Sequence, residues 1–190
     1  MRTLTGVVAV AAGLAMVPAV AIAQGAAPKH ELGVDLGLGL QSPSGGTTHI
    51  VLVTPVDVRL GFVATSPLSW EGRLTLFYDS KGIGGSNARY SLAPDIQALY
   101  RLGSGSGAHG LMGPYATVGA GLNFADVPNG AGGTNSSAVV RLNGGVGTRI
   151  PYGSGAFRIE GFVAYDFRNT TLGLPGTLEV GTRLGISLWH

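Results

Sequence analysis

The feature that most constrains this chain is a period-two alternation of apolar and polar side chains that recurs along most of its length. In residues 32–40, leucine and valine occupy every second position, and glycine and Asp35 lie between them. Side chains of a β-strand point alternately to its two faces, so this spacing predicts a strand with one apolar and one mixed face. Eight such strands are predicted, over residues 32–40, 50–62, 70–79, 90–101, 116–124, 140–150, 157–167 and 178–188.

These predicted strands have the length and number expected of a membrane barrel. A tilted strand of about ten residues crosses a bilayer, and an even number of strands brings both chain ends to one side. The connections near 66–69 and 151–155 are short, whereas those near 41–49, 80–89, 125–137 and 168–176 are mostly longer. Pro55 cannot donate a ladder hydrogen bond and predicts a local distortion. The predicted fold is all-β, an eight-stranded antiparallel up-and-down transmembrane β-barrel.

Charge distribution favours a membrane barrel over a soluble, lipocalin-like cup with an apolar interior. Every charged residue of the predicted strands falls on the mixed face, and an isolated charge facing mid-bilayer lipid costs about 2–4 kcal/mol. The interior of an eight-stranded barrel is just wide enough for side chains to fill. We therefore predict a network of ion pairs in the lumen. Its predicted members are Asp35, Asp57, Arg59, Glu71, Arg73, Asp95, Arg101, Arg141, Arg149, Arg158, Glu160, Asp166, Glu179 and Arg183.

Aromatic residues on the apolar face gather near the predicted strand ends, and the middles carry Leu, Val, Ile and Ala. Rings at both rims are typical of a protein with two membrane–water interfaces. The predicted aromatic girdle comprises Phe62, Trp70, Tyr100 and Phe157 at one rim and Tyr78, Tyr90, Phe124, Tyr165 and Phe167 at the other.

The N-terminal segment has the features of a secretory signal peptide. Arg2 supplies a positive charge, residues 6–23 are uncharged and mostly apolar, and the small residues Ala21 and Ala23 flank a cleavage site before Gln24. An uncleaved membrane anchor is the alternative, which Pro18 and the lack of a following basic cluster disfavour. We expect residues 1–23 to be removed, residues 24–190 to form the barrel domain, and the protein to reside in the bacterial outer membrane.

Composition excludes several other functions. The sequence contains no cysteine, its formal net charge is +2, and it has no basic run, so neither disulfides nor nucleic-acid binding is expected. The four histidines are scattered, without the spacing of a metal site. No phosphate-binding or dinucleotide-binding motif is present, so no cofactor is predicted.

At this point the chain resembles the small outer-membrane proteins of the OmpA/OmpX-like group over nearly its whole mature length. The resemblance rests on the alternation, on residues 114–121 (PYATVGAG) and on the last predicted strand, residues 184–190 (LGISLWH). In that group the final strand ends in an aromatic residue, usually Phe, which the barrel-assembly machinery recognises. Here Trp189 is followed by His190. The resemblance implies lipid, lipopolysaccharide and the assembly machinery as partners, and we expect a monomer.

The predicted function is a non-enzymatic barrel with a plugged polar lumen, acting in envelope integrity or in surface interaction. A narrow pore for small solutes is the first alternative, with Arg59, Arg73, Arg141 and Arg183 as selectivity candidates. An acyl-modifying enzyme is the second alternative. His49, Asp79 and Ser80 lie near predicted outer loops, in a set that resembles that of the lipid-A palmitoyltransferase barrels, and a His-activated Ser suits acyl transfer. Little more than residues 24–29 of the expected mature chain precedes the first predicted strand, whereas that family has an N-terminal amphipathic helix.

Overall fold

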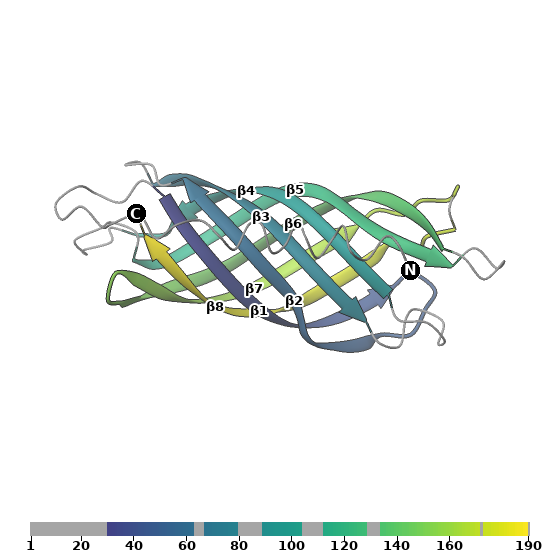
Figure 1. The fold of residues 1–190 in the computed structure, drawn as a ribbon, viewed down its shortest axis with the longest axis horizontal. Coiled ribbons are helices and arrows are strands. Elements are labelled where there is room, and N and C mark those ends of the chain that lie inside the picture. Colours follow the sequence, from purple (N-terminus) through teal and green to yellow (C-terminus); the bar gives the residue numbers. More distant parts are fainter. Residues whose placement is uncertain are drawn as a thin grey trace.

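The computed structural model describes residues 30–62, 67–79, 89–103, 112–128, 134–171 and 173–189. Eight strands wind around one closed barrel (Figure 1), which confirms the predicted fold class. The strands are β1 (His30–Pro43), β2 (His49–Phe62), β3 (Leu68–Asp79), β4 (Arg89–Arg101), β5 (Gly113–Pro128), β6 (Thr134–Tyr152), β7 (Gly155–Asp166) and β8 (Thr177–Trp189).

Each strand pairs antiparallel with the next, and β1 closes the barrel against β8. The closing register runs from Glu31 opposite Trp189 to Pro43 opposite Thr177. The start of β1 and the end of β8 therefore share one end of the barrel. We call this the inner end and the opposite one the outer end, because bacterial barrels place both chain termini in the periplasm.

The strands are longer than the sequence pattern predicted. They contain 12 to 19 residues, and β6 is the longest. The β5–β6 ladder continues to Pro128 opposite Thr134, inside the segment 125–137 that was predicted to be a loop. Hydrogen-bond pairing of a hairpin can continue after the hydrophobic alternation has stopped. The alternation therefore gave the apolar part of each strand and missed its polar extensions.

The predicted distortion near Pro55 is present. The β1–β2 register passes from Leu36 opposite Val56 to Leu38 opposite Leu52, so β2 contains extra residues around the proline. A proline lacks the N–H that a regular ladder needs, and a bulge accommodates this without ending the strand.

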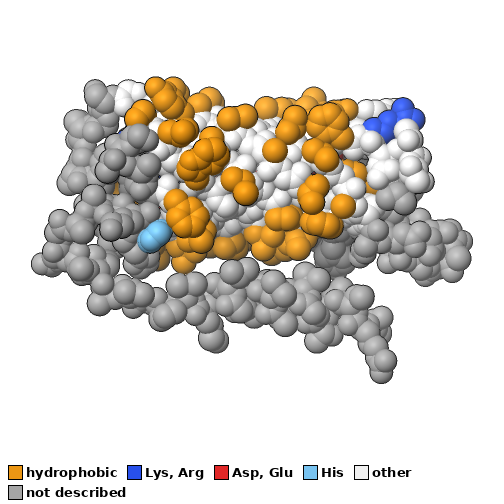
Figure 2. Space-filling model, turned by 90° about the horizontal axis from the view of Figure 1, so that it is seen from above, with side chains coloured by type: hydrophobic (Ala, Val, Ile, Leu, Met, Phe, Trp, Pro, Cys, Tyr) orange, Lys and Arg blue, Asp and Glu red, His pale blue; other side chains and the backbone are white. Residues whose placement is uncertain are grey.

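The two faces of the barrel wall have opposite polarity. Outward-facing Leu36, Val146 and Leu184 are 53%, 62% and 59% exposed, whereas inward-facing Asp35 and Glu160 are each 1% exposed. The visible part of the wall carries orange hydrophobic side chains around a white backbone (Figure 2). This polarity is the reverse of a soluble cup and matches a surface solvated by lipid. In the described part of the chain, no helix is long and apolar enough to cross a membrane.

A few apolar side chains also face the lumen. Leu99 is 1% exposed and Phe162 is 4% exposed, on the same faces as the buried charges. At the inner end, Trp189 packs with Ala156, and Met112 lies against the pair. The side chains that face the lumen are therefore of mixed polarity.

Candidate functional site: the charged lumen

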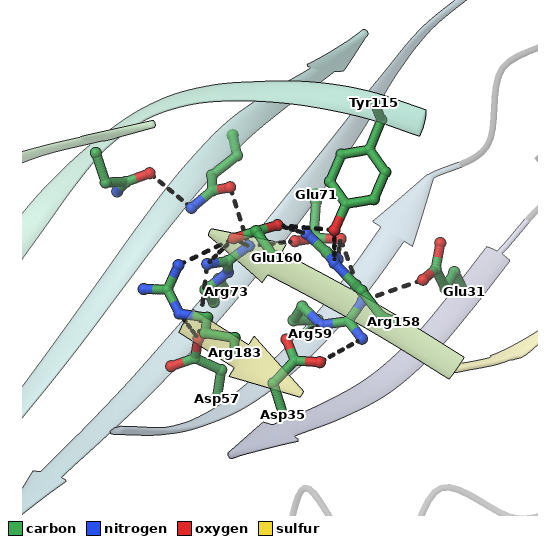
Figure 3. Close-up of polar contacts among 12 residues, drawn as sticks. Glu31, Asp35, Asp57, Arg59, Glu71, Arg73, Tyr115, Arg158, Glu160 and Arg183 are labelled. Carbon is green, nitrogen blue, oxygen red and sulfur yellow. Dashed lines mark hydrogen bonds and ion pairs between the residues drawn. The ribbon is translucent and has the colours of Figure 1, made fainter. Parts of the chain in front are cut away.

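Thirteen of the fourteen predicted network residues are buried in the barrel, and Arg101, near the inner end of β4, is half-buried. With Glu31, the buried charges of the described residues comprise eight carboxylates and six arginines. Most of them form one group that we call the central cluster (Figure 3). Its members are Glu31, Asp35, Asp57, Arg59, Glu71, Arg73, Arg149, Arg158, Glu160 and Arg183.

Arg59 of β2 holds the inner side of the central cluster together. Its guanidinium is fully buried and is bonded by carboxylates of both neighbouring strands. Nε and Nη2 donate to the two oxygens of Asp35 at 2.5 and 2.9 Å, and Nη1 donates to Glu31 at 3.0 Å and to Glu71 at 3.3 Å. The planar fork of arginine is suited to such two-point binding of a carboxylate.

Three ion pairs cross the lumen between strands that are not adjacent, and two of them join strands directly opposite each other. Arg158 of β7 donates to Glu71 of β3 at 2.6 Å, and Arg149 of β6 donates to Glu31 of β1 at 2.6 Å. Arg73 of β3 donates to Glu160 of β7 at 3.2 Å. Strands β3 and β7 lie four positions apart in the eight-stranded ring, so these side chains meet across the lumen.

Glu160 is the carboxylate on which the most contacts converge. Its Oε1 accepts from Arg73 and, at 3.0 Å, from Arg183. Its Oε2 accepts from the Tyr115 hydroxyl at 3.0 Å and from Arg158. One carboxylate is thus shared by three arginines from three strands, which fixes their positions relative to one another.

Aromatic rings occupy the space between the arginines. The Tyr115 ring lies 5.0 Å from the Arg149 guanidinium carbon and 4.8 Å from that of Arg158. The Arg183 guanidinium carbon lies 3.7 Å from the centre of the Phe162 ring. Such cation–π contacts stabilise desolvated guanidinium groups and fill volume that a carboxylate alone would leave empty.

A second, smaller group of charges lies nearer the outer end. Arg141 donates to both oxygens of Asp166 at 3.1 Å and to Glu179 at 2.6 Å, and Asn123 donates to Asp166 at 2.9 Å. We call Arg141, Asp166 and Glu179 the outer triad. Among the described residues, no hydrogen bond or ion pair joins it to the central cluster. The polar interior therefore has two tiers.

Several residues of this interior are absent from the predicted set. Glu31 lies one position before the predicted start of the first strand, so a strand drawn one residue longer would have included it. The alternation places Tyr115, Gln97 and Ser187 on the inward face of their strands. It therefore predicts that their side chains point into the lumen, but not which residues they bond. Gln97 donates to Asn143 at 2.6 Å, and Ser187 donates to Glu31 at 2.5 Å.

Lumen glycines leave room for these long side chains. A Cβ built on Gly33 would collide with the guanidinium of Arg59, the residue opposite it on β2. A Cβ on Gly147 would meet the Tyr115 hydroxyl and a backbone carbonyl. By contrast, Gly72 and Gly161 face outward, and a Cβ there would meet only one carbonyl oxygen, at 3.9 Å.

The side chains that the structure describes assemble no metal site. No cluster of His, Cys, Asp or Glu among them could hold a metal ion. The hypothetical acyl-transfer set cannot be located, because Ser80 and the side chains of His49 and Asp79 lie outside the described residues.

The predicted girdle residues that are described point outward near strand ends. Phe62, Trp70, Tyr100 and Phe157 lie at the inner end, and Phe124, Tyr165 and Phe167 lie at the outer end. Tyr78 and Tyr90 pair across β3 and β4, and their side chains are outside the described residues. Tyr152, which the prediction did not include, is exposed at the inner end, with its ring centre 4.9 Å from that of Phe157.

Comparison with known proteins places this architecture among small outer-membrane barrels. No protein-family model and no curated protein sequence matches the chain. Among solved structures, the chain is similar to Neisserial surface protein A, with a TM-score of 0.65 and 14% identity over 87% of this chain and all of that one. It is also similar to Ail, the attachment invasion locus protein of Yersinia pestis, with a TM-score of 0.54 and 12% identity over 86% of this chain and all of that one. The chain thus has the fold of the small eight-stranded outer-membrane β-barrels.

Proposed function

We propose that this protein is a non-enzymatic outer-membrane barrel whose charged lumen is a closed plug, and that it acts in envelope integrity or surface interaction. The observation that carries the proposal is the set of ion pairs between opposite walls, above all Arg158–Glu71 at 2.6 Å. A side-chain pair that bridges the lumen occupies the path that a solute would take. The surrounding arginines and carboxylates fill an interior that is already narrow in a barrel of eight strands.

Burying this many charges is stable only if each is matched. A carboxylate or guanidinium taken out of water loses several kcal/mol of hydration, which its partners must return. Arg59, Arg73, Arg158 and Arg183 each contact two or more carboxylates. Such a network resists opening, because moving any one of these arginines removes an ion pair from at least two buried carboxylates at once.

Conductance of the refolded protein in planar bilayers tests the plug. We expect the wild type to insert without steady current steps. The double variant Arg158→Ala/Glu71→Ala should conduct, because it removes both side chains of an ion pair that crosses the lumen. Removing both together avoids leaving either charge without the other. Leu36→Ala, on the lipid-facing side of β1, is the matched control and should stay closed. Heat-modifiable migration in gels establishes that each variant is folded.

A stable open channel in the wild type would overturn the plug and support a narrow pore instead. The described lumen holds eight carboxylates against six arginines, so such a pore should prefer cations. Arg59, Arg73, Arg141 and Arg183 would then be the residues to exchange for a change in selectivity.

Location and processing are tested separately. We propose that residues 1–23 are removed on export and that the remainder assembles as a monomer in the outer membrane through the barrel-assembly machinery. Fractionation of a Gram-negative host should recover the protein with the outer membrane, with Gln24 as its first residue. Recovery from the soluble periplasm, or retention of Met1 to Ala23, would contradict this part of the proposal.

A further inference from the structure

A cavity of about 260 Å³ lies at the outer end of the barrel, between the end of β1 and the β7–β8 connection. It is separate from the charged lumen clusters, and none of the described residues that line it is acidic. The lining residues are Ser44, Arg168, Thr170, Gly173, Leu174 and Pro175.

Arg168 gives this cavity a positive charge that no described carboxylate neutralises through an ion pair. It is exposed, and no carboxylate of the described residues forms an ion pair with it. The carboxylate nearest in sequence, Asp166, is bonded through both oxygens to Arg141 at 3.1 Å. An exposed guanidinium beside a cavity without acids attracts an anion.

Hydrogen bonds hold the cavity walls in place. The backbone N–H and the hydroxyl of Ser44 both donate to the carbonyl of Gly176, at 2.8 and 3.0 Å. Asn169 and Leu174 exchange two backbone hydrogen bonds, at 3.1 and 2.9 Å. The connection is thus tied both to itself and to β1, so the polar groups of Arg168 and Thr170 are presented from an ordered frame.

Neighbouring aromatic residues set the height of the cavity relative to the membrane. Tyr165 and Phe167 are exposed on the outer wall, and their ring centres are 5.2 Å apart. Aromatic side chains of membrane proteins gather at the level of the lipid headgroups. Arg168 directly follows Phe167 and therefore lies at that level or just above it.

We propose that this cavity binds a phosphate group of lipid A from the outer leaflet, an assignment that rests on the proposed outer-membrane orientation. Arg168 would hold the phosphate through paired N–H donors, and the hydroxyl of Thr170 is a further donor, whereas the Ser44 hydroxyl is already committed to the Gly176 carbonyl. Leu174 and Pro175 form an apolar wall suited to the first carbons of an acyl chain. A guanidinium, a hydroxyl and an apolar wall match an amphiphile with a phosphorylated headgroup better than a soluble anion.

Native mass spectrometry of the full barrel in detergent, titrated with diphosphorylated lipid A, tests the site. Arg168→Ala should weaken binding about tenfold, the loss expected when one charge-assisted hydrogen-bonding group is removed. Arg168→Lys should retain part of the affinity, because it keeps the charge but loses the fork. Thr171→Ala is the matched control, since Thr171 is exposed on the same connection but does not line the cavity.

Three results would overturn the assignment. These are equal affinity of wild type and Arg168→Ala, equal binding of lipid A without its phosphates, and binding of water-soluble glucosamine 1-phosphate as tight as that of lipid A. The last result would assign the cavity to a soluble phosphosugar. Conductance measured on the same wild-type sample separates the two proposals, because a channel that still binds lipid A would refute only the plug.

Discussion

The lumen face and the lipid face of these strands use the same residue types under opposite physical demands. Gly147 faces the lumen, where a Cβ would meet the Tyr115 hydroxyl, whereas Gly161 on the adjoining strand faces outward, where a Cβ would meet only one carbonyl oxygen, at 3.9 Å. Leu99 is 1% exposed inside the barrel, and Leu184 is 59% exposed outside it. The lumen face thus behaves as a packed protein core made partly of charges, and the lipid face as a surface whose only requirement is to be apolar.

Removing one charge from the core should have the largest effect. Arg59→Met takes the central cation from Asp35, Glu31 and Glu71 and leaves their carboxylates buried without it. Breaking a buried ion pair in this way typically costs about 3–5 kcal/mol. Guanidinium unfolding of the barrel in lipid vesicles, followed by gel migration, measures the loss. A change below about 1 kcal/mol, within the range of ordinary surface substitutions, would mean that the lumen is hydrated and not packed.

Adding one charge to the lipid face should have the next largest effect. Val146→Arg places a guanidinium mid-strand at a position 62% exposed on the outer wall, with an expected cost of about 2–4 kcal/mol. Leu102→Arg, just beyond the inner end of β4, is the control. It should cost about 0–1 kcal/mol, because the interface is hydrated. Equal costs at the two positions would contradict a bilayer around the middle of the barrel.

A matched pair of glycine substitutions compares the faces with the smallest chemical change. Gly147→Ala should destabilise the barrel by about 1–3 kcal/mol through overpacking against Tyr115. Gly161→Ala should change stability by no more than about 0.5 kcal/mol, because the added methyl group meets lipid. Equilibrium unfolding of both variants in one lipid gives the difference directly. A larger loss of stability for Gly161→Ala than for Gly147→Ala would mean that the lumen-facing and lipid-facing sides of the strands have been assigned the wrong way round.

The smallest expected effect is at the aromatic rim. Trp70 lies opposite Phe62 on β2, and cross-strand aromatic pairs contribute about 0.2–1 kcal/mol. Trp70→Leu should therefore cost no more than about 1 kcal/mol, with Trp189 remaining as the fluorescent reporter of unfolding. A loss comparable to that of Arg59→Met would show that the rim, and not the lumen, dominates stability.

The sequence was sufficient to predict the strand number, the barrel and the burial of thirteen of the fourteen charged side chains assigned to the lumen, because a strand has a strict period of two. The same period explains why strand ends were placed too short, since polar ladder extensions carry no hydrophobic signal. Phe162 and Leu99 lie on the charged face, so apolar side chains also point into the lumen. The alternation of apolar and polar residues does not predict such exceptions.

Partners across the lumen could not be predicted. Arg158 and Glu71 are 87 positions apart. Nothing in the sequence around either residue indicates that it pairs with the other and not with a different buried charge. Their meeting depends on how the strands are staggered when the sheet closes, and staggering is a property of the whole barrel. The prediction therefore identified most members of the network, but not which residues bond or that they separate into two tiers.

The central claim, that charged side chains face a lumen and apolar ones face lipid, is tested most directly by methyl NMR of the wild-type barrel in nanodiscs. A lipid that carries a nitroxide near the end of its acyl chain broadens only those methyl groups that hydrocarbon reaches. We expect strong broadening for Leu36, Leu184 and Ile186, and little for Leu99 inside the barrel. Equal broadening of Leu99, or protection of Leu36, Leu184 and Ile186 from the lipid nitroxide, would contradict the account.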